Sequence, residues 1–134
     1  LGADRVIYHF EIKKDHKEII AKIREIGMGV GLAVNPSTEI DDFRYLVEEL
    51  DTVLFLSVNP GFYGASFIPQ VLDKIRNFKK KYPQKQTGID GGIKQDNLFQ
   101  VKQTGLDYVC VGSAILKSDD PAKKFREFVK LFNG

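Results

Sequence analysis

One carboxylate stands where a short apolar strand is expected to end, directly before two glycines, in the segment Thr87-Gly88-Ile89-Asp90-Gly91-Gly92-Ile93. The carboxylate of Asp90 can carry a proton, and the backbone N–H groups of Gly91 and Gly92 can approach an anion closely. The segment therefore suits proton transfer on a phosphorylated substrate. The same residues are also typical of an ordinary β-turn, with Asp at its start and Gly further on, which would do no chemistry.

Two further loops carry residues that suit a phosphate. In the loop 57–64, Gly61 and Gly64 allow backbone N–H groups to face an anion, or allow the loop to move as a lid. After the last expected strand, Gly112 and Ser113 offer a hydroxyl and N–H groups near a helix start. The alternatives are a flexible surface loop for the first segment and a simple turn for the second, with Ser113 as a helix cap.

The pattern of apolar residues predicts five strands, each followed by a helix. Strands are expected at 5–10, 30–35, 52–58, 86–90 and 108–112. Helices are expected at 15–26, 40–50, 69–81, 95–103 and 121–132. The strand at 52–58 is apolar without alternation, which is typical of a parallel sheet buried on both faces. Strands that alternate with helices in this way are parallel and are joined by right-handed crossovers.

Two helices carry more detailed expectations. Ser37 or Thr38 is expected to cap the helix at 40–50. The helix at 121–132 is expected to turn its apolar face inward. The members of that face are Phe125, Phe128, Val129 and Phe132.

The choice of architecture lies between an open doubly wound sheet and a β/α barrel. No Gly-x-Gly-x-x-Gly follows a strand and no Gly-Lys-Ser/Thr loop is present, so the nucleotide-binding open sheets lose their main support. A barrel fits better, because phosphate sites in barrels commonly form from the loops after the last two strands. A complete (β/α)8 TIM barrel has eight units and about 250 residues. The sequence therefore predicts an α/β fold that represents part of such a barrel, with about five units.

Composition excludes several classes of protein. With 43% hydrophobic and 28% charged residues, the 134-residue chain is an ordinary globular sequence. A net charge of +2 is too small to indicate a nucleic-acid or membrane partner, and we expect neither. The basic run 79–81 is interpreted as the solvated end of a helix.

The single cysteine and the chain ends bear on location. Cys110 lies between two valines and is interpreted as a small buried residue, and one cysteine excludes an internal disulfide framework. No apolar stretch approaches the roughly 20 residues of a membrane span. We therefore expect a cytoplasmic protein. The chain begins at Leu1, almost directly before a strand, so we expect further residues upstream.

Four motifs, in this order, closely resemble the ribulose-phosphate 3-epimerase family. They are the segments 31–38, 57–64 with 67–69, 89–93 and 111–115. The resemblance covers essentially all of the chain. It implies a TIM barrel of the ribulose-phosphate-binding type, of which residues 1–134 form the C-terminal part of one domain. The chain would then hold the fourth to eighth strand-helix units, and the first three would be absent.

The resemblance also implies a reaction and a cofactor. Members of the family interconvert D-ribulose 5-phosphate and D-xylulose 5-phosphate in the pentose phosphate pathway, through an enediolate, with two aspartates and a divalent metal ion such as zinc, iron, manganese or cobalt. Asp90 matches the aspartate that acts as acid and base and also binds the metal. The matching substrate-binding residues are Gly61, Phe62, Tyr63 and Gly64 in the covering loop, and Gly91, Gly92, Gly112 and Ser113 in the phosphate cradle.

The sequence also departs from the family pattern. The second aspartate, the two metal-binding histidines and an early serine of the family belong to the absent units, so we expect the chain alone to be inactive. Ala65 stands where the family usually carries glutamine. His9 matches a family histidine that is not a metal ligand, and His16 is interpreted as a solvated residue of a helix.

Two other functions stay open. One is a 3-epimerase that acts on a six-carbon ketose phosphate. The other is a non-catalytic half-barrel that binds a sugar phosphate or a partner chain. An incomplete barrel would expose strand edges and an apolar flank, so we expect a homo-oligomer.

Overall fold

A computed structural model describes residues 2–60 and 66–134 of the chain. The strands are β1 (Arg5–His9), β2 (Gly29–Val34), β3 (Thr52–Leu56), β4 (Gln86–Asp90) and β5 (Tyr108–Cys110). The helices are α1 (His16–Glu25), α2 (Ile40–Phe43), α3 (Gln70–Lys81), α4 (Gln95–Lys102), α5 (Ser113–Leu116) and α6 (Pro121–Asn133), and η1 (Arg44–Glu49) is a 3₁₀ helix. The predicted alternation of five strands with helices is confirmed.

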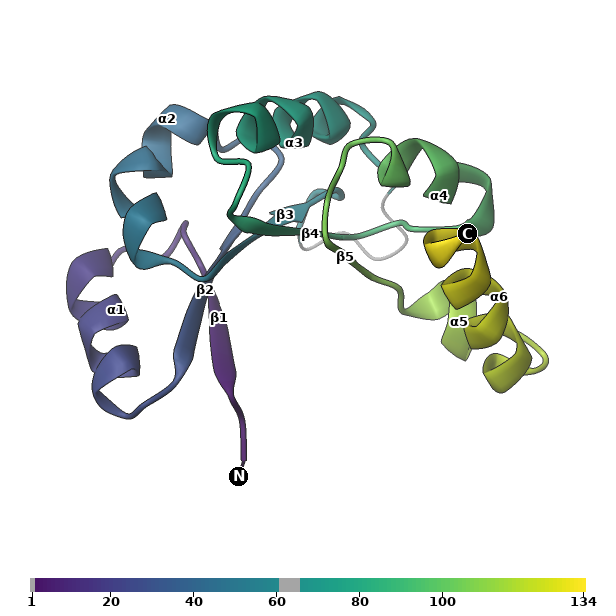
Figure 1. Cartoon of the computed structure of the whole chain (residues 1–134), viewed down its shortest axis with the longest axis horizontal. Helices are drawn as coiled ribbons and strands as arrows, with labels where there is room; N and C mark the ends of the chain where they lie inside the picture. The colour runs from purple at the N-terminus through teal and green to yellow at the C-terminus, as the bar shows by residue number, and fades with distance from the viewer. Residues whose placement is uncertain (1, 61–65) are drawn as a thin grey trace.

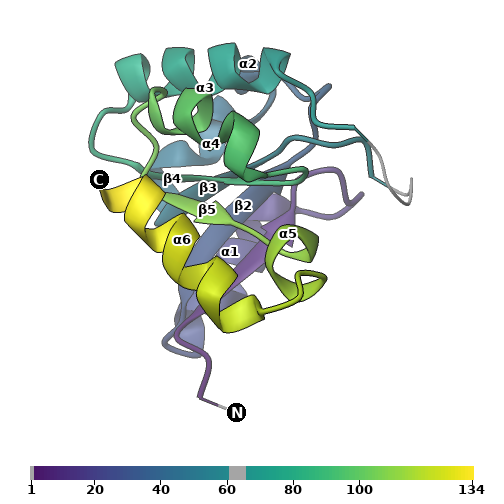
Figure 2. The same ribbon diagram turned by 90° about the vertical axis from the view of Figure 1, so that its right-hand side faces the viewer.

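The five strands form one parallel sheet in chain order, β1-β2-β3-β4-β5. Figure 1 shows the sheet curved into an arch, with the helices outside the curve, and Figure 2 shows the same layers from the side. Because the strands are parallel, their carboxyl ends meet at one edge and their amino ends at the other. The arch therefore has two distinct edges, and none of the described helices lies on its concave face.

The core lies between the sheet and the helices. The strand side chains that face the helices are Val30, Leu32, Val34, Val53, Phe55 and Ile89, all at most 1% exposed. Phe43, Phe55 and Phe78 pack as a trio, with ring centroids 5.4 to 6.4 Å apart. Since side chains alternate along a strand, the residues between these core positions face the concave side.

Local capping explains where α1 begins and how the chain leaves it. The Asp15 carboxylate accepts the N–H of Glu18 at 3.1 Å, and Gly27, just beyond the helix, has a φ of 79°. The prediction that His16 is solvated is wrong. Its ring is partly buried, stacks on Phe10 with centroids 4.8 Å apart, and has Nδ1 3.2 Å from the Tyr8 hydroxyl.

The single helix predicted at 40–50 is wrong in detail, because the segment divides into α2 and η1. A 3₁₀ helix places residues i and i+3 on one face, and this spacing lets Phe43 and Leu46 both reach the core. The predicted cap by Ser37 or Thr38 is also wrong. The N-cap is Glu39, and the Thr38 hydroxyl instead donates to the Glu11 carboxylate at 2.6 Å.

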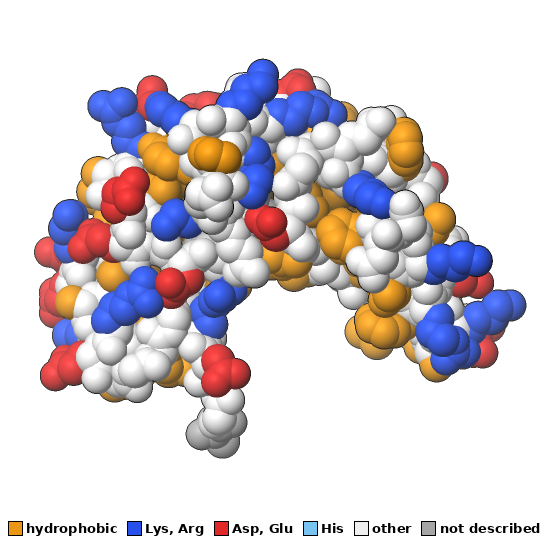
Figure 3. All heavy atoms as spheres, viewed as in Figure 1, with side chains coloured by type: hydrophobic (Ala, Val, Ile, Leu, Met, Phe, Trp, Pro, Cys, Tyr) orange, Lys and Arg blue, Asp and Glu red, His pale blue; other side chains and the backbone are white. Residues whose placement is uncertain are grey.

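The apolar face predicted to lie inward on α6 is covered only in part, and Phe132 is partly buried against the core. Phe128 is buried, but Phe125 is 57% exposed and Val129 is 39% exposed. The physical reason is the position of α6 at the end of the arch, where β5 pairs only with β4 among the described strands. An apolar groove is lined by Tyr108, Val109, Val111, Ile115, Phe125, Phe128, Val129 and Phe132, together with Asp107 and Asn133. Figure 3 shows apolar side chains gathered at this end of the arch.

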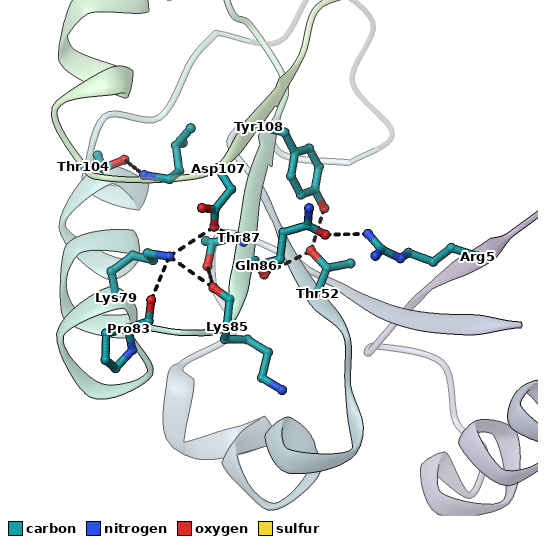
Figure 4. A network of polar contacts seen from close by, with 11 residues as sticks. Arg5, Thr52, Lys79, Pro83, Lys85, Gln86, Thr87, Thr104, Asp107 and Tyr108 are labelled. Atoms are coloured by element: carbon teal, nitrogen blue, oxygen red, sulfur yellow. Dashed lines mark hydrogen bonds and ion pairs between the residues drawn. The ribbon is translucent and has the colours of Figure 1, made fainter. Parts of the chain in front are cut away.

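A charged cluster closes the amino edge of the sheet (Figure 4). The Asp107 carboxylate accepts the backbone N–H of Thr87 at 2.8 Å and pairs with the Lys79 ammonium at 3.1 Å. Lys79 also donates to the carbonyl oxygens of Pro83 and Lys85. The interpretation of the basic run in α3 as a solvated helix end is therefore wrong for Lys79, which ties α3 to the turn before β4 and to the residue before β5.

A second set of polar contacts crosses the concave side of the same edge (Figure 4). The Thr52 hydroxyl lies 2.9 Å from the Tyr108 hydroxyl and donates to the Gln86 carbonyl at 3.0 Å, while Arg5 donates to the Gln86 side chain at 2.5 Å. Gly88 makes the crossing possible, because a Cβ there would lie 2.2 Å from the Tyr108 ring. This edge is consequently held by paired groups from four strands.

Candidate functional site

Asp90 is the last residue of β4, in the middle of the carboxyl edge formed with β3 and β5. Its register partners are Leu56 on β3 and Cys110 on β5. Ile89 faces the helix layer, so Asp90, the next residue, faces the concave side. The prediction that an apolar strand delivers this carboxylate to its tip is confirmed.

The surroundings of Asp90 shift its acidity. The carboxyl is about half buried, and burial raises its pKa above the ordinary value of 3.8. A carboxylate whose pKa is raised is a stronger base, which suits proton abstraction. Beside it, burial and the negative charge of Asp90 raise the pKa of the Cys110 thiol. Cys110 is only partly buried, which corrects the expectation of a core residue, and its thiol stays protonated at neutral pH.

The two glycines after Asp90 have backbone conformations that other residues rarely adopt. The φ angle is 124° at Gly91 and 68° at Gly92. A Cβ at Gly91 would lie 2.9 Å from Val58, and a Cβ at Gly92 would lie 3.1 Å from the Cβ of Phe67. The turn therefore needs glycine for its conformation and for its close contact with the segments on either side of residues 61–65.

The loop after β5 lies at the same edge, since β5 is the neighbour of β4. Gly112 is the N-cap of α5, and its carbonyl accepts the N–H groups of Ile115 and Leu116, each at 3.0 Å. Ser113 is exposed and is the first residue of α5 rather than its cap, which corrects that alternative. A helix start near Ser113 was expected, but the ranges of the predicted helices did not include α5.

The structure thus brings part of the predicted site to one edge. Gly91 and Gly92 follow Asp90 on β4, and Gly112 and Ser113 follow the adjacent β5. The four predicted residues of the covering loop, Gly61, Phe62, Tyr63 and Gly64, lie outside the described residues. Whether any of these residues binds substrate stays a prediction.

One residue at this edge was missed as a candidate. Ser57 follows β3 and is fully buried, and its hydroxyl contacts the backbone of Asp90 and Gly91. The signal available in the sequence was a hydroxyl residue within an otherwise apolar strand pattern, but Ser57 was interpreted only as part of the strand at 52–58 and as the start of the loop that follows it.

The side chains present do not make a metal site by themselves. Across residues 2–60 and 66–134, no group of three or more His, Cys, Asp or Glu side chains is arranged to hold a metal ion. Asp90 offers one carboxylate, and divalent metals in proteins need several ligands. In the same part of the chain, no helix has both the length and the apolar character needed to cross a membrane.

Comparison with known proteins gives the family. Residues 1–116 match the model of the ribulose-phosphate 3 epimerase family. The chain is 35% identical over 130 residues to the ribulose-phosphate 3-epimerase of Escherichia coli K12, covering 94% of this chain and 58% of that protein. It is 35% identical over 120 residues to the Schizosaccharomyces pombe enzyme of the same name, covering 90% of this chain and 53% of the relative.

Solved structures give the fold. Thiamine phosphate pyrophosphorylase from Pyrococcus furiosus superimposes with a TM-score of 0.72 at 23% identity, covering 98% of this chain and 60% of that chain. For 3-hexulose-6-phosphate synthase from Salmonella typhimurium the TM-score is 0.71 at 22% identity, with 98% and 63% coverage. These neighbours are TIM-barrel enzymes, and the five strand-helix units here are a partial barrel of that kind.

The chain spans 58% of the length of its Escherichia coli relative, so the family assignment applies to the part that is present. Within that part, the family model, the relatives and the parallel β/α architecture all point to the same family. The chain belongs to the ribulose-phosphate 3-epimerase family.

Proposed function

We propose that this chain carries one half of the active site of an isomerase that interconverts D-ribulose 5-phosphate and D-xylulose 5-phosphate in the pentose phosphate pathway. The observation that carries the proposal is Asp90, a half-buried carboxylate of raised pKa at the carboxyl edge, directly before a glycine turn. Family membership supports the same reaction. We propose the complete active site only for a polypeptide as long as the relatives, which are longer than this chain.

Asp90 acts as the acid and base on one face of the substrate. Its desolvated carboxylate takes the proton from C3, and the enediolate then receives a proton on the opposite face from a second acid. Inversion at C3 needs two such groups, and this chain provides one of them. The 134-residue chain alone is therefore expected to be inactive. The resemblance to the family further implies that it forms the C-terminal part of one domain.

The phosphate of the substrate lies at the neighbouring loops. Backbone N–H groups of Gly91 and Gly92, with those of Gly112 and Ser113, surround it and leave the sugar carbons beside Asp90. By the resemblance, residues 61–64, which lie outside the described residues, would contribute to substrate binding. Glycine in this turn is useful because it lets the backbone approach an anion without an intervening side chain.

A divalent metal ion, zinc, iron, manganese or cobalt, is part of the proposal through the resemblance alone. When bound, it would stabilise negative charge on the enediolate oxygens. Asp90 can supply one oxygen ligand, while the described residues supply no complete set. The roles proposed for Asp90 and for the glycine turn do not depend on the metal. A cytoplasmic location and a homo-oligomeric state are likewise proposals.

A chimera tests the reaction. The first three strand-helix units of the Escherichia coli relative are joined to this chain, and exchange between the two pentose phosphates is followed in a coupled assay with metal supplied. We expect activity in the chimera and a loss of about 100-fold or more in its Asp90→Asn variant. A chimera that has a folded circular dichroism spectrum and shows no exchange would contradict the proposal. Faster turnover of a six-carbon ketose phosphate would favour that substrate instead.

The uncovered groove beside β5 favours a second candidate, a half-barrel that associates through this face. Exposed apolar area of this kind is typical of an interaction surface. Sedimentation of the 134-residue chain tests it. A monomer at all concentrations would exclude association through the groove, whereas a dimer that Phe125→Lys dissociates would support it.

A further inference from the structure

Ser57 occupies the junction between the end of β3 and the turn that follows Asp90. Ser57 is completely buried, although serine residues are usually exposed. Leu56 is the register partner of Asp90, so Ser57 lies one residue beyond that pair. By the alternation of side chains its hydroxyl points to the helix side of the sheet, whereas Asp90 faces the concave side.

Every polar group of Ser57 is used at this junction. Its backbone N–H donates to the Asp90 carbonyl at 2.9 Å, and its hydroxyl donates to the Gly91 carbonyl at 2.6 Å. The hydroxyl oxygen also lies 3.1 Å from the Asp90 carbonyl oxygen. The Ser57 carbonyl accepts the N–H of Ile68 at 2.7 Å. One residue therefore joins the ends of β3 and β4 to the segment that leads into α3.

The bond to the Gly91 carbonyl has a consequence for the next peptide. In a planar trans peptide, the carbonyl and the following N–H point in opposite directions. Holding the Gly91 carbonyl toward Ser57 therefore turns the Gly92 N–H away from Ser57. Glycine itself restrains a backbone little, and both residues of this turn have positive φ angles. The conformation of the turn therefore depends on contacts such as this bond and the one that the Asn97 side-chain amide donates to the Gly92 carbonyl at 2.9 Å.

We propose that Ser57 is a positioning residue, which fixes the Asp90 backbone and the orientation of the Gly92 N–H for proton transfer and phosphate binding. The proposal rests on the proposed function for its reaction, but its geometry does not. Removal of the hydroxyl would leave the Gly91 carbonyl without its short hydrogen bond and would let the glycine turn change conformation. A misplacement of about 1 Å in such a site can lower the rate about 100-fold.

Thr104 provides a matched control. It is 5% exposed, and its hydroxyl donates to the Val101 carbonyl at 2.7 Å, in the turn between α4 and β5. Thr104→Val and Ser57→Ala each remove one buried hydroxyl that donates to a carbonyl. Their losses of stability should be similar. Of these two hydroxyls, only that of Ser57 contacts the backbone of Asp90, so only Ser57→Ala should affect the site.

The experiment has two independent readouts. In the chimera, we expect Ser57→Ala to lower kcat about 10-fold or more while Thr104→Val leaves it unchanged. In the 134-residue chain, a titration with inorganic phosphate followed at the Gly92 amide by NMR should need more phosphate to saturate in Ser57→Ala than in the wild type, whereas Thr104→Val should leave it unchanged. Equal effects of the two variants, or no change in either readout for Ser57→Ala, would overturn the proposal.

Two possible failures are kept distinct. An inactive wild-type chimera would count against the proposed function, whereas the NMR titration would still decide the role of Ser57. If Ser57→Ala does not fold, Ser57→Cys replaces it, since a thiol is a weaker donor than a hydroxyl. An unchanged phosphate titration at the Gly92 amide in a folded Ser57→Cys chain would then overturn the proposal.

Discussion

The amino and carboxyl edges of the same sheet are built in opposite ways. At the amino edge, Asp107 has both a cationic partner and a backbone donor, and the Tyr108 hydroxyl meets Thr52. At the carboxyl edge, Asp90 is half buried with a raised pKa, and the turn after it has two positive φ angles. The first edge satisfies its polar groups for stability, while the second leaves a carboxylate in a costly state that suits chemistry.

Gly88→Ala should give the largest loss of stability, and it tests the amino edge. The added Cβ would lie 2.2 Å from the Tyr108 ring, so the ring must move and its bond to Thr52 must break. We expect a loss of about 3 kcal/mol in the free energy of unfolding, measured by urea denaturation. The double variant Gly88→Ala with Tyr108→Ala should lose less than the two single losses combined. Additive losses would show that Tyr108 does not fill the space at Gly88.

Asp107→Ala should have the next largest effect. It leaves the Thr87 N–H without its acceptor and removes the partner of Lys79. Because the N–H of a buried residue is involved, we expect a loss of about 2 kcal/mol. The exposed Asp96→Ala serves as the control and should change stability by less than about 0.5 kcal/mol. Equal losses in the two variants would mean that the amino edge is no more tightly held than the surface.

Asp90→Asn should have the smallest effect on stability, and of the opposite sign. Burial raises the folded-state pKa above the ordinary 3.8, so the charged form destabilises the folded chain when the pH is above that raised value. The variant should therefore be slightly more stable than the wild type at neutral pH. This gain should shrink as the pH falls through the raised pKa and should be lost below 3.8, where both states bind the proton. A variant that is less stable at neutral pH would show that Asp90 stabilises the fold.

Much of the fold was predictable because the relevant signals are local. The apolar stretch at 52–58 and the helical spacing around Ile19 and Ile23 lie within single elements, and both elements form. The burial of the apolar face of α6 was not predictable in this way. The spacing of Phe125 and Val129 indicates an apolar face, but whether something covers that face depends on the neighbours of β5, which periodicity does not report.

In the candidate site, too, local features were predictable and long-range contacts were not. Asp90 and the glycines after it were predictable because a carboxylate before Gly-Gly at a strand end is visible in the sequence. The role inferred for Ser57 was not predictable, since it depends on hydrogen bonds between residues more than 30 positions apart. The same holds for Lys79, whose partner Asp107 lies 28 positions away. Long-range pairing of polar groups leaves no pattern in a single sequence.

The most direct test is an amide NMR titration of the 134-residue chain with D-ribulose 5-phosphate, because it compares the two edges in one experiment. We predict shifts at Gly91, Gly92, Gly112 and Ser113, with none at Thr87 and Asp107. Inorganic phosphate should shift the same four amides, since the proposed cradle contacts the phosphate. Shifts confined to the amino edge, or no shifts at millimolar ligand, would contradict the claim that the carboxyl edge is the functional one.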